Sequence, residues 1–201
     1  MTTPQDLFIV ATDVPGDRPV EQGDLSLALA GAELIDLLGA RALTLDDERI
    51  VPGPPLALGD RLLDEAGAAL VRREPYESVE DWLWRRGEGL TGAYLDELDA
   101  RGQLTGERRH WLPYRPKADA AAGTEARRHA TGRWESHEPV LAGLAAALGL
   151  GEDGDRAGEA LGDEAVVTVL AAVNHALTEL EGVRQRRRIE NAAFDNIWRA
   201  P

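Results

Sequence analysis

Apolar residues recur at intervals of three and four along most of the chain, the spacing that places them on one face of an α-helix. In the clearest case, within residues 24–38, Leu27, Ala30 and Leu34 are followed by Gly39, a residue that favours a helix end. Similar spacing predicts helices over residues 61–73, 78–86, 91–101, 124–133, 139–148, 164–180 and 183–198. The pattern therefore predicts a mainly α fold. No repeat or long linker divides the chain, so we expect one domain over residues 1–201.

The shorter apolar segments carry less information. The run at residues 7–11 fits either a strand or one buried helical turn, because so short a run has no readable period. Two β-hairpins are predicted where short segments flank polar turns, at residues 41–51 and 103–112. The glycine- and aspartate-rich residues 149–163 are predicted to form a loop within the domain.

Composition excludes several classes of protein. The 201 residues include no cysteine, which rules out disulfides, thiolate zinc sites and a cysteine nucleophile. No apolar stretch approaches the ~20 residues that a membrane span needs, and the N-terminus lacks the features of a signal peptide. We therefore expect a cytoplasmic protein, at most peripheral at the inner membrane face. Arginine far outnumbers lysine and alanine is abundant, which is typical of a GC-rich, bacterial genome.

The formal net charge is −14, but it is unevenly distributed. Residues 101–135 and 181–201 each carry more basic than acidic side chains. A local basic patch attracts anions even on an acidic protein, because salt screens charges beyond ~8 Å. The overall charge repels nucleic acid, so we expect no nucleic-acid partner. The same arginines also fit a solvated face paired with neighbouring carboxylates.

No motif for catalysis or cofactor binding stands out. The GxGxxG match at residues 149–154 follows a helical pattern and has acidic neighbours, and a calcium-loop match at residues 153–164 lacks an oxygen ligand at Ala157. The four histidines have no metal-ligand spacing, and His175, inside an apolar helical pattern, is expected in the core. We therefore predict no cofactor and no metal, with catalytic residues unknown and a non-enzyme favoured.

The order of motifs resembles the Golgi phosphoprotein 3 family, in its bacterial branch. Residues 59–66, Gly-Asp-Arg-Leu-Leu-Asp-Glu-Ala, are similar to the T-G-D-x-L-L-D-E-A signature of that family. Residues 7–10 resemble its opening apolar segment, residues 29–43 its first long helix and following strand, and residues 79–83 its V-x-x-W segment. The resemblance extends over residues 6–198 and is most specific over residues 25–112.

The resemblance implies a helical bundle core wrapped by amphipathic helices, with one or two small β-hairpins. Eukaryotic members bind phosphatidylinositol 4-phosphate and the cytoplasmic tails of glycosyltransferases, and some oligomerise. The family's headgroup arginine falls near Leu29 or Ala30 of this chain, and its headgroup tryptophan near Glu21 or Gln22, so both are replaced. The basic residues left for a headgroup site are Arg115, Lys117, Arg127, Arg128 and Arg133, with Trp111 or Trp134 as an interfacial aromatic.

Two functions therefore remain open. The first is a peripheral, non-catalytic protein that binds an anionic phospholipid headgroup, including a phosphoinositide, or a membrane-associated protein. The alternative is a small-molecule-binding protein or enzyme of bacterial secondary metabolism that uses an interior pocket of the fold. A structural homo-oligomer is a third option.

Overall fold

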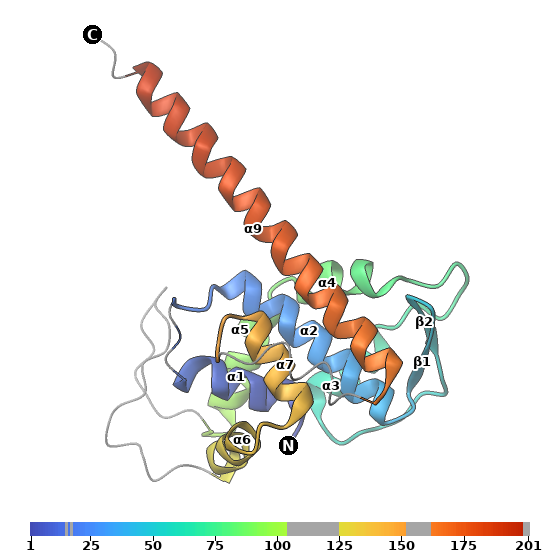
Figure 1. Cartoon of the computed structure of the whole chain (residues 1–201). Coiled ribbons are helices and arrows are strands. Elements are labelled where there is room, and N and C mark those ends of the chain that lie inside the picture. The colour runs from blue at the N-terminus through green and yellow to red at the C-terminus, as the bar shows by residue number, and fades with distance from the viewer. Residues whose placement is uncertain (15, 17, 104–124, 152–161, 199–201) are drawn as a thin grey trace.

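The structure is a computed structural model that describes residues 1–14, 16, 18–103, 125–151 and 162–198, with side chains as far as residue 191. Helices dominate these residues, and two strands form one antiparallel hairpin (Figure 1). The elements are α1 (Thr3–Asp13), α2 (Gln22–Gly39), β1 (Leu43–Asp46), β2 (Arg49–Pro52), α3 (Arg61–Ala68), α4 (Val79–Gly87), α5 (Leu90–Ala100), α6 (Glu125–Glu135), α7 (Pro139–Ala147) and α9 (Glu164–Trp198). The predicted mainly α fold with a small hairpin is confirmed.

Helix α2 lies at the centre of the fold. Its residues from Leu25 to Ile35 are all buried, as is Leu37, so the helix needs neighbours on every side. Helices α1, α4, α5 and α9 supply them and pack against α2 in Figure 1. On α4, the fully buried Trp82 donates its indole N–H to the carbonyl oxygen of Ala30, 3.1 Å away. The core therefore forms around a single apolar helix.

The apolar run at residues 7–11 is helical. It lies inside α1, where Leu7, Phe8, Ile9 and Val10 are all buried. Pro4 at the start of this helix favours helical backbone, because its ring fixes φ and its missing N–H is not needed in the first turn. Burial on all sides explains why the run shows no helical period.

A glycine allows α9 to cross α2 closely. A Cβ atom added to Gly31 would overlap Cγ2 of Val173 on α9, and would lie 3.7 Å from side-chain atoms of both Leu83 and Val169. Val173 and Val169 are fully buried at this crossing. The absence of a side chain at residue 31 therefore sets how near the two backbones come.

Side-chain caps fix the starts of the helices that cover the core. Asp60 accepts from the backbone N–H of Leu63 at 3.2 Å at the start of α3, and Ser78 accepts from the backbone N–H of Asp81 at 3.0 Å at the start of α4. Helix α3 ends at Ala68 rather than at the predicted residue 73. The chain turns there because Leu70 enters the core.

The first predicted hairpin is confirmed. Strands β1 and β2 pair antiparallel, with Leu45 opposite Ile50, and Asp47 in the connecting turn has a positive φ of 51°. Ile50 is buried and anchors the hairpin to the core. The second predicted hairpin, at residues 103–112, lies outside the described residues except for residue 103.

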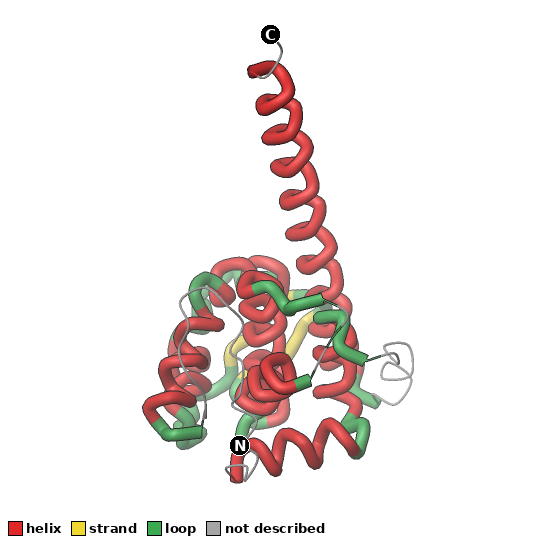
Figure 2. Tube along the Cα trace, turned by 90° about the vertical axis from the view of Figure 1, so that its left-hand side faces the viewer, coloured by secondary structure: helices red, strands yellow, loops and turns green. Residues whose placement is uncertain are grey.

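The C-terminal part of the chain forms one long helix rather than the predicted two. Helix α9 continues through Gly182, which costs about 1 kcal/mol in a helix interior but does not break it. Its first half packs against α2, α4 and α7, and its second half extends away from the body in both views (Figures 1 and 2). The helix over Glu164–Asn191 is long enough, and one 18-residue window of it apolar enough, to cross a membrane; the window has a mean hydropathy of 1.2, and 22% of it is buried. Val169, Val173 and Ala176 of this helix lie in the core.

Candidate functional site

The arginines of α6 were predicted to bind an anionic headgroup, and the structure places two of them in ion pairs. Arg127 faces Asp13, the last residue of α1, with its Nε 2.5 Å from Oδ2 and its Nη2 2.9 Å from Oδ1 of Asp13. Both side chains are largely buried. Because the guanidinium lies beside this carboxylate, its main role here is to hold α6 against α1.

Arg133 belongs to a second ion-pair cluster between α6 and α1. Its Nη1 lies 2.7 Å from Oδ2 of the fully buried Asp6, and its Nη2 lies 2.6 Å from Oε2 of Glu138. The other oxygen of Asp6 lies 3.0 Å from Nδ1 of the exposed His129. A buried carboxylate needs such partners, since an isolated buried charge is strongly unfavourable. Arg133 therefore compensates the charge of Asp6.

The remaining predicted site residues differ in their exposure to solvent, and some lie outside the described part of the chain. Arg128 is exposed and makes no ion pair within the described part of the chain. Trp134 is half-buried and packs against the core, beside Gly151. Arg115, Lys117 and Trp111 lie outside the described residues. The structure thus brings Arg127, Arg128 and Arg133 onto one helix, but leaves only Arg128 with a solvated guanidinium.

A second basic region lies on α9, at the point where the helix leaves the body. Arg184 binds two carboxylates at the start of α2, with Nη1 2.7 Å from Oδ1 of Asp24 and Nε 3.1 Å from Oε2 of Glu21. Partial burial raises the pKa of Asp24 above its usual value, although the hydrogen bond from Arg184 opposes this shift. Arg184 is the last side chain of α9 that binds another element within the described residues.

Residues 185–198 of α9, which we call the arm, project beyond Arg184 (Figure 2). Arg186 and Arg187 are exposed and have no carboxylate partner among the described residues. Arg188 binds Glu181, two helical turns earlier in α9, at 2.6 Å and remains exposed. Ile189, 61% exposed, is the most exposed large hydrophobic side chain that the structure describes. The arm therefore presents basic and apolar groups to solvent.

The predicted headgroup residues lie within residues 101–135, whereas the arm lies outside that range. The basic run at residues 184–188 is the feature of the sequence that could have indicated the arm. What the sequence could not reveal is that the body ends at Arg184, since that depends on where α2 begins in space. The prediction of a core position for His175 was wrong, because His175 is exposed on α9 and lies 3.8 Å from Glu179.

A second fully buried carboxylate, that of Glu33, belongs to a structural cluster. Glu33 on α2 is fully buried and accepts from Arg86 Nε at 2.7 Å, from Arg86 Nη2 at 2.9 Å and from the hydroxyl of Tyr94 at 3.0 Å. Burial raises the pKa of Glu33 despite these donors, and burial together with the Glu33 charge raises the pKa of Tyr94. With every oxygen occupied, Glu33 ties α2 to α4 and α5 rather than facing a ligand.

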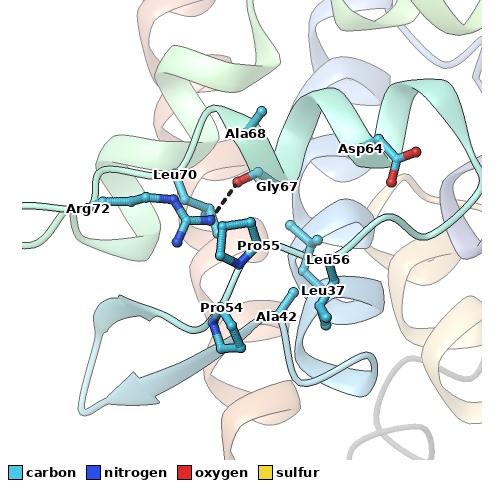
Figure 3. A pocket seen from close by; sticks show the side chains of 10 residues that line it. All are labelled: Leu37, Ala42, Pro54, Pro55, Leu56, Asp64, Gly67, Ala68, Leu70 and Arg72. Carbon is cyan, nitrogen blue, oxygen red and sulfur yellow. Dashed lines mark hydrogen bonds between the residues drawn. The ribbon is translucent and has the colours of Figure 1, made fainter.

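A groove of about 320 Å³ lies at the surface between α3 and the segment after β2 (Figure 3). Most of the residues that line it are apolar, and the two charged ones are Asp64 and Arg72. Arg72 donates to the carbonyl oxygen of Gly53 at 2.7 Å and to that of Gly67 at 3.5 Å. Asp64 accepts from the backbone N–H of Leu58 at 2.6 Å. These charged groups stabilise the loop, and the groove is a surface feature rather than the interior pocket of the alternative hypothesis.

Comparison with known proteins identifies the family. The family model described as Golgi phosphoprotein 3 (GPP34) matches residues 4–193, which includes all of α1 except its first residue, all of α2 to α7 and most of α9. No curated protein matches the chain. Since the matched region covers nearly the whole sequence, the chain belongs to the Golgi phosphoprotein 3 family.

Proposed function

We propose that this protein binds anionic phospholipid headgroups peripherally, and that the α9 arm is its main contact with the lipid surface. The observation that carries the proposal is the pair of exposed arginines, Arg186 and Arg187, on a helix that projects from an acidic protein (Figure 1). Family membership supports it, because the resemblance implies a lipid-binding function. Arg128 on α6 is the second candidate contact.

The acidic charge of the body opposes contact with an anionic surface, and the position of the arginines along the arm decides how strongly they feel it. At about 1.5 Å per residue, residues 185–198 extend roughly 20 Å beyond the last contact with the body. At physiological ionic strength charges are screened over ~8 Å. Arg186 and Arg187 lie at the base of the arm, only about 3–4.5 Å along the helix beyond Arg184, so the net charge of −14 still opposes their attraction to an anionic surface.

The expected affinity is modest and depends on salt. Each basic residue near an anionic membrane contributes about 1 kcal/mol, so Arg186 and Arg187 together contribute about 2 kcal/mol. Ile189 adds exposed apolar surface, and the sequence of the arm continues with Phe194, Ile197 and Trp198, residue types typical of interfacial helices. Weak binding through several such contributions is the pattern of a reversible peripheral protein.

Sedimentation with lipid vesicles tests the proposal. The wild-type protein should sediment with vesicles of phosphatidylcholine containing phosphatidylglycerol or phosphatidylinositol 4-phosphate at low salt, and not with phosphatidylcholine alone. Arg186→Glu combined with Arg187→Glu should weaken binding by roughly 30-fold or more, the equivalent of about 2 kcal/mol. A loss with phosphatidylinositol 4-phosphate alone would indicate headgroup recognition rather than general attraction to anions.

The matched control reverses two exposed arginines of the body. Arg41→Glu combined with Arg73→Glu changes the net charge by the same amount, and neither side chain has a carboxylate partner among the described residues. Binding by this control should stay within a few-fold of wild type. Equal losses in both double variants, or no sedimentation of the wild type at low salt, would refute the proposal.

A further inference from the structure

Three exposed side chains with the chemistry of metal ligands meet where α4 lies against α9. They are Glu80 in the first turn of α4, and His175 and Glu179 on α9, and one potential ligand atom of each lies within 4.8 Å of the other two. The Nε2 atom of His175 is 3.8 Å from Oε1 of Glu179. Their separation in the sequence explains why the spacing of the histidines did not reveal them.

The two helices hold these groups in place. His175 and Glu179 are one helical turn apart, so they share a face of α9. Glu80 follows the cap residue Ser78 and the buried Val79, which fix the start of α4. Two ligands at about 2.0–2.2 Å from one ion are at most about 4.4 Å apart, so the exposed side chains need only small rotations to close around it.

The local charge also favours a cation. Within the described residues neither Glu80 nor Glu179 has an arginine partner. The arginines of α4 are already engaged, because Arg85 binds Glu77 at 2.7 Å and Arg86 binds the buried Glu33 at 2.7 Å. Two carboxylates without a compensating cation, beside an imidazole nitrogen, therefore face the same point in solvent.

We propose that Glu80, His175 and Glu179 form a surface site for a divalent transition metal, with zinc as the best fit. One nitrogen and two carboxylate oxygens match the donor types of zinc, whereas magnesium and calcium prefer oxygen ligands alone. Three protein ligands leave a fourth position for water or an exogenous ligand. The bound ion joins α4 to α9 close to Arg184, and so stiffens the base of the arm. This inference is independent of the proposed lipid function.

Titration of the full-length, untagged protein with zinc tests the site. Calorimetry should show one zinc ion per chain, and cobalt should give the visible absorption of a site with mixed nitrogen and oxygen ligands. At a free zinc concentration of about 100 times the Kd, mass action should raise the Tm by roughly 5–10 °C. Magnesium at the same concentration should leave the Tm unchanged.

Substitutions of exposed side chains locate the ion without disturbing the core. His175→Ala, Glu179→Gln and Glu80→Gln should each weaken zinc binding by at least about tenfold, since even loss of a ligand's hydrogen-bond partner has that effect. The matched control is His137→Asn, which removes another exposed histidine at a position of positive φ that asparagine tolerates. This variant should bind zinc as wild type does.

Three results would overturn the proposal. One is the absence of saturable zinc binding by the wild-type chain. Another is zinc affinity that survives both His175→Ala and Glu179→Gln. The third is an equal loss of affinity in His137→Asn, which would place the ion elsewhere. Circular dichroism of each variant verifies that α9 keeps its helicity.

Discussion

Substitution of Gly31 by alanine tests the close crossing of α2 and α9. The added methyl group would overlap Cγ2 of Val173, a fully buried side chain of α9. Val173 cannot easily turn away, because a valine in a helix has one strongly preferred χ1 rotamer. One of the two helices must therefore shift within a packed core.

The expected magnitude is the difference between two opposing effects. Overpacking a core by one methyl group costs about 1–3 kcal/mol, whereas replacing glycine by alanine inside a helix contributes up to about 1 kcal/mol of stability. Gly31→Ala should therefore lower the free energy of unfolding by roughly 1–2 kcal/mol. Gly132→Ala is the matched control, because Gly132 lies in α6 with nothing within 4 Å of an added Cβ atom. The control should be neutral or more stable by up to about 1 kcal/mol.

Urea unfolding, followed by circular dichroism and by the fluorescence of tryptophans such as the buried Trp82, measures these differences. A double-mutant cycle with Val173→Ala tests the specific contact. Shortening residue 173 should relieve the overlap, so the two substitutions together should cost at least about 1 kcal/mol less than the sum of their separate costs. Additive effects, or a Gly31→Ala protein as stable as the Gly132→Ala control, would show that the helices do not meet as closely as described.

Two further substitutions test the ion pair and the cap that hold α4. Glu33→Gln leaves Arg86 without its carboxylate and should cost about 3–5 kcal/mol in chemical unfolding, whereas Glu65→Gln, at an exposed pair with Arg61, should cost under about 1 kcal/mol. Folding raises the pKa of Glu33, so its contribution to stability is complete below about pH 4.5 and is lost as pH rises through the higher folded pKa. The stability advantage of wild type over Glu33→Gln should therefore shrink as pH increases above that point, and an advantage that grows with pH would contradict the assignment. Ser78→Ala should lower the Tm by roughly 2–4 °C through loss of about 1 kcal/mol, and an unchanged Tm would show that the cap contributes nothing.

The elements that the sequence predicts well are those whose signal is local. The periodic apolar positions around Leu34 identify α2, and Asp60 and Ser78 identify the starts of α3 and α4 from their side-chain chemistry alone. The family signature at residues 59–66, which lies at the start of α3, identifies the family and with it the mainly α fold.

The features that the sequence does not reveal depend on distant partners. The arginines of α6 look free in the sequence, and only the structure shows that Asp6 and Asp13 of α1 neutralise Arg133 and Arg127. The groups at residues 80 and 175 come together only because α4 packs against α9. Arg186 and Arg187 are exposed because the contact of α9 with the start of α2 ends at Arg184, which only the packing of the two helices shows.

The boundary at Arg184 also divides α9 by how strongly its side chains contribute to the stability of the fold. Up to that residue, α9 packs buried side chains such as Val169 and Val173 against the core, so substitutions of those side chains alter the stability of the whole fold. Beyond it, the side chains described as far as residue 191 bind no other element, and an isolated helix of the length of the arm is marginally stable in water. Changes in the arm should therefore have little effect on the folding of the body, so its binding properties can be altered by substitution without loss of the fold.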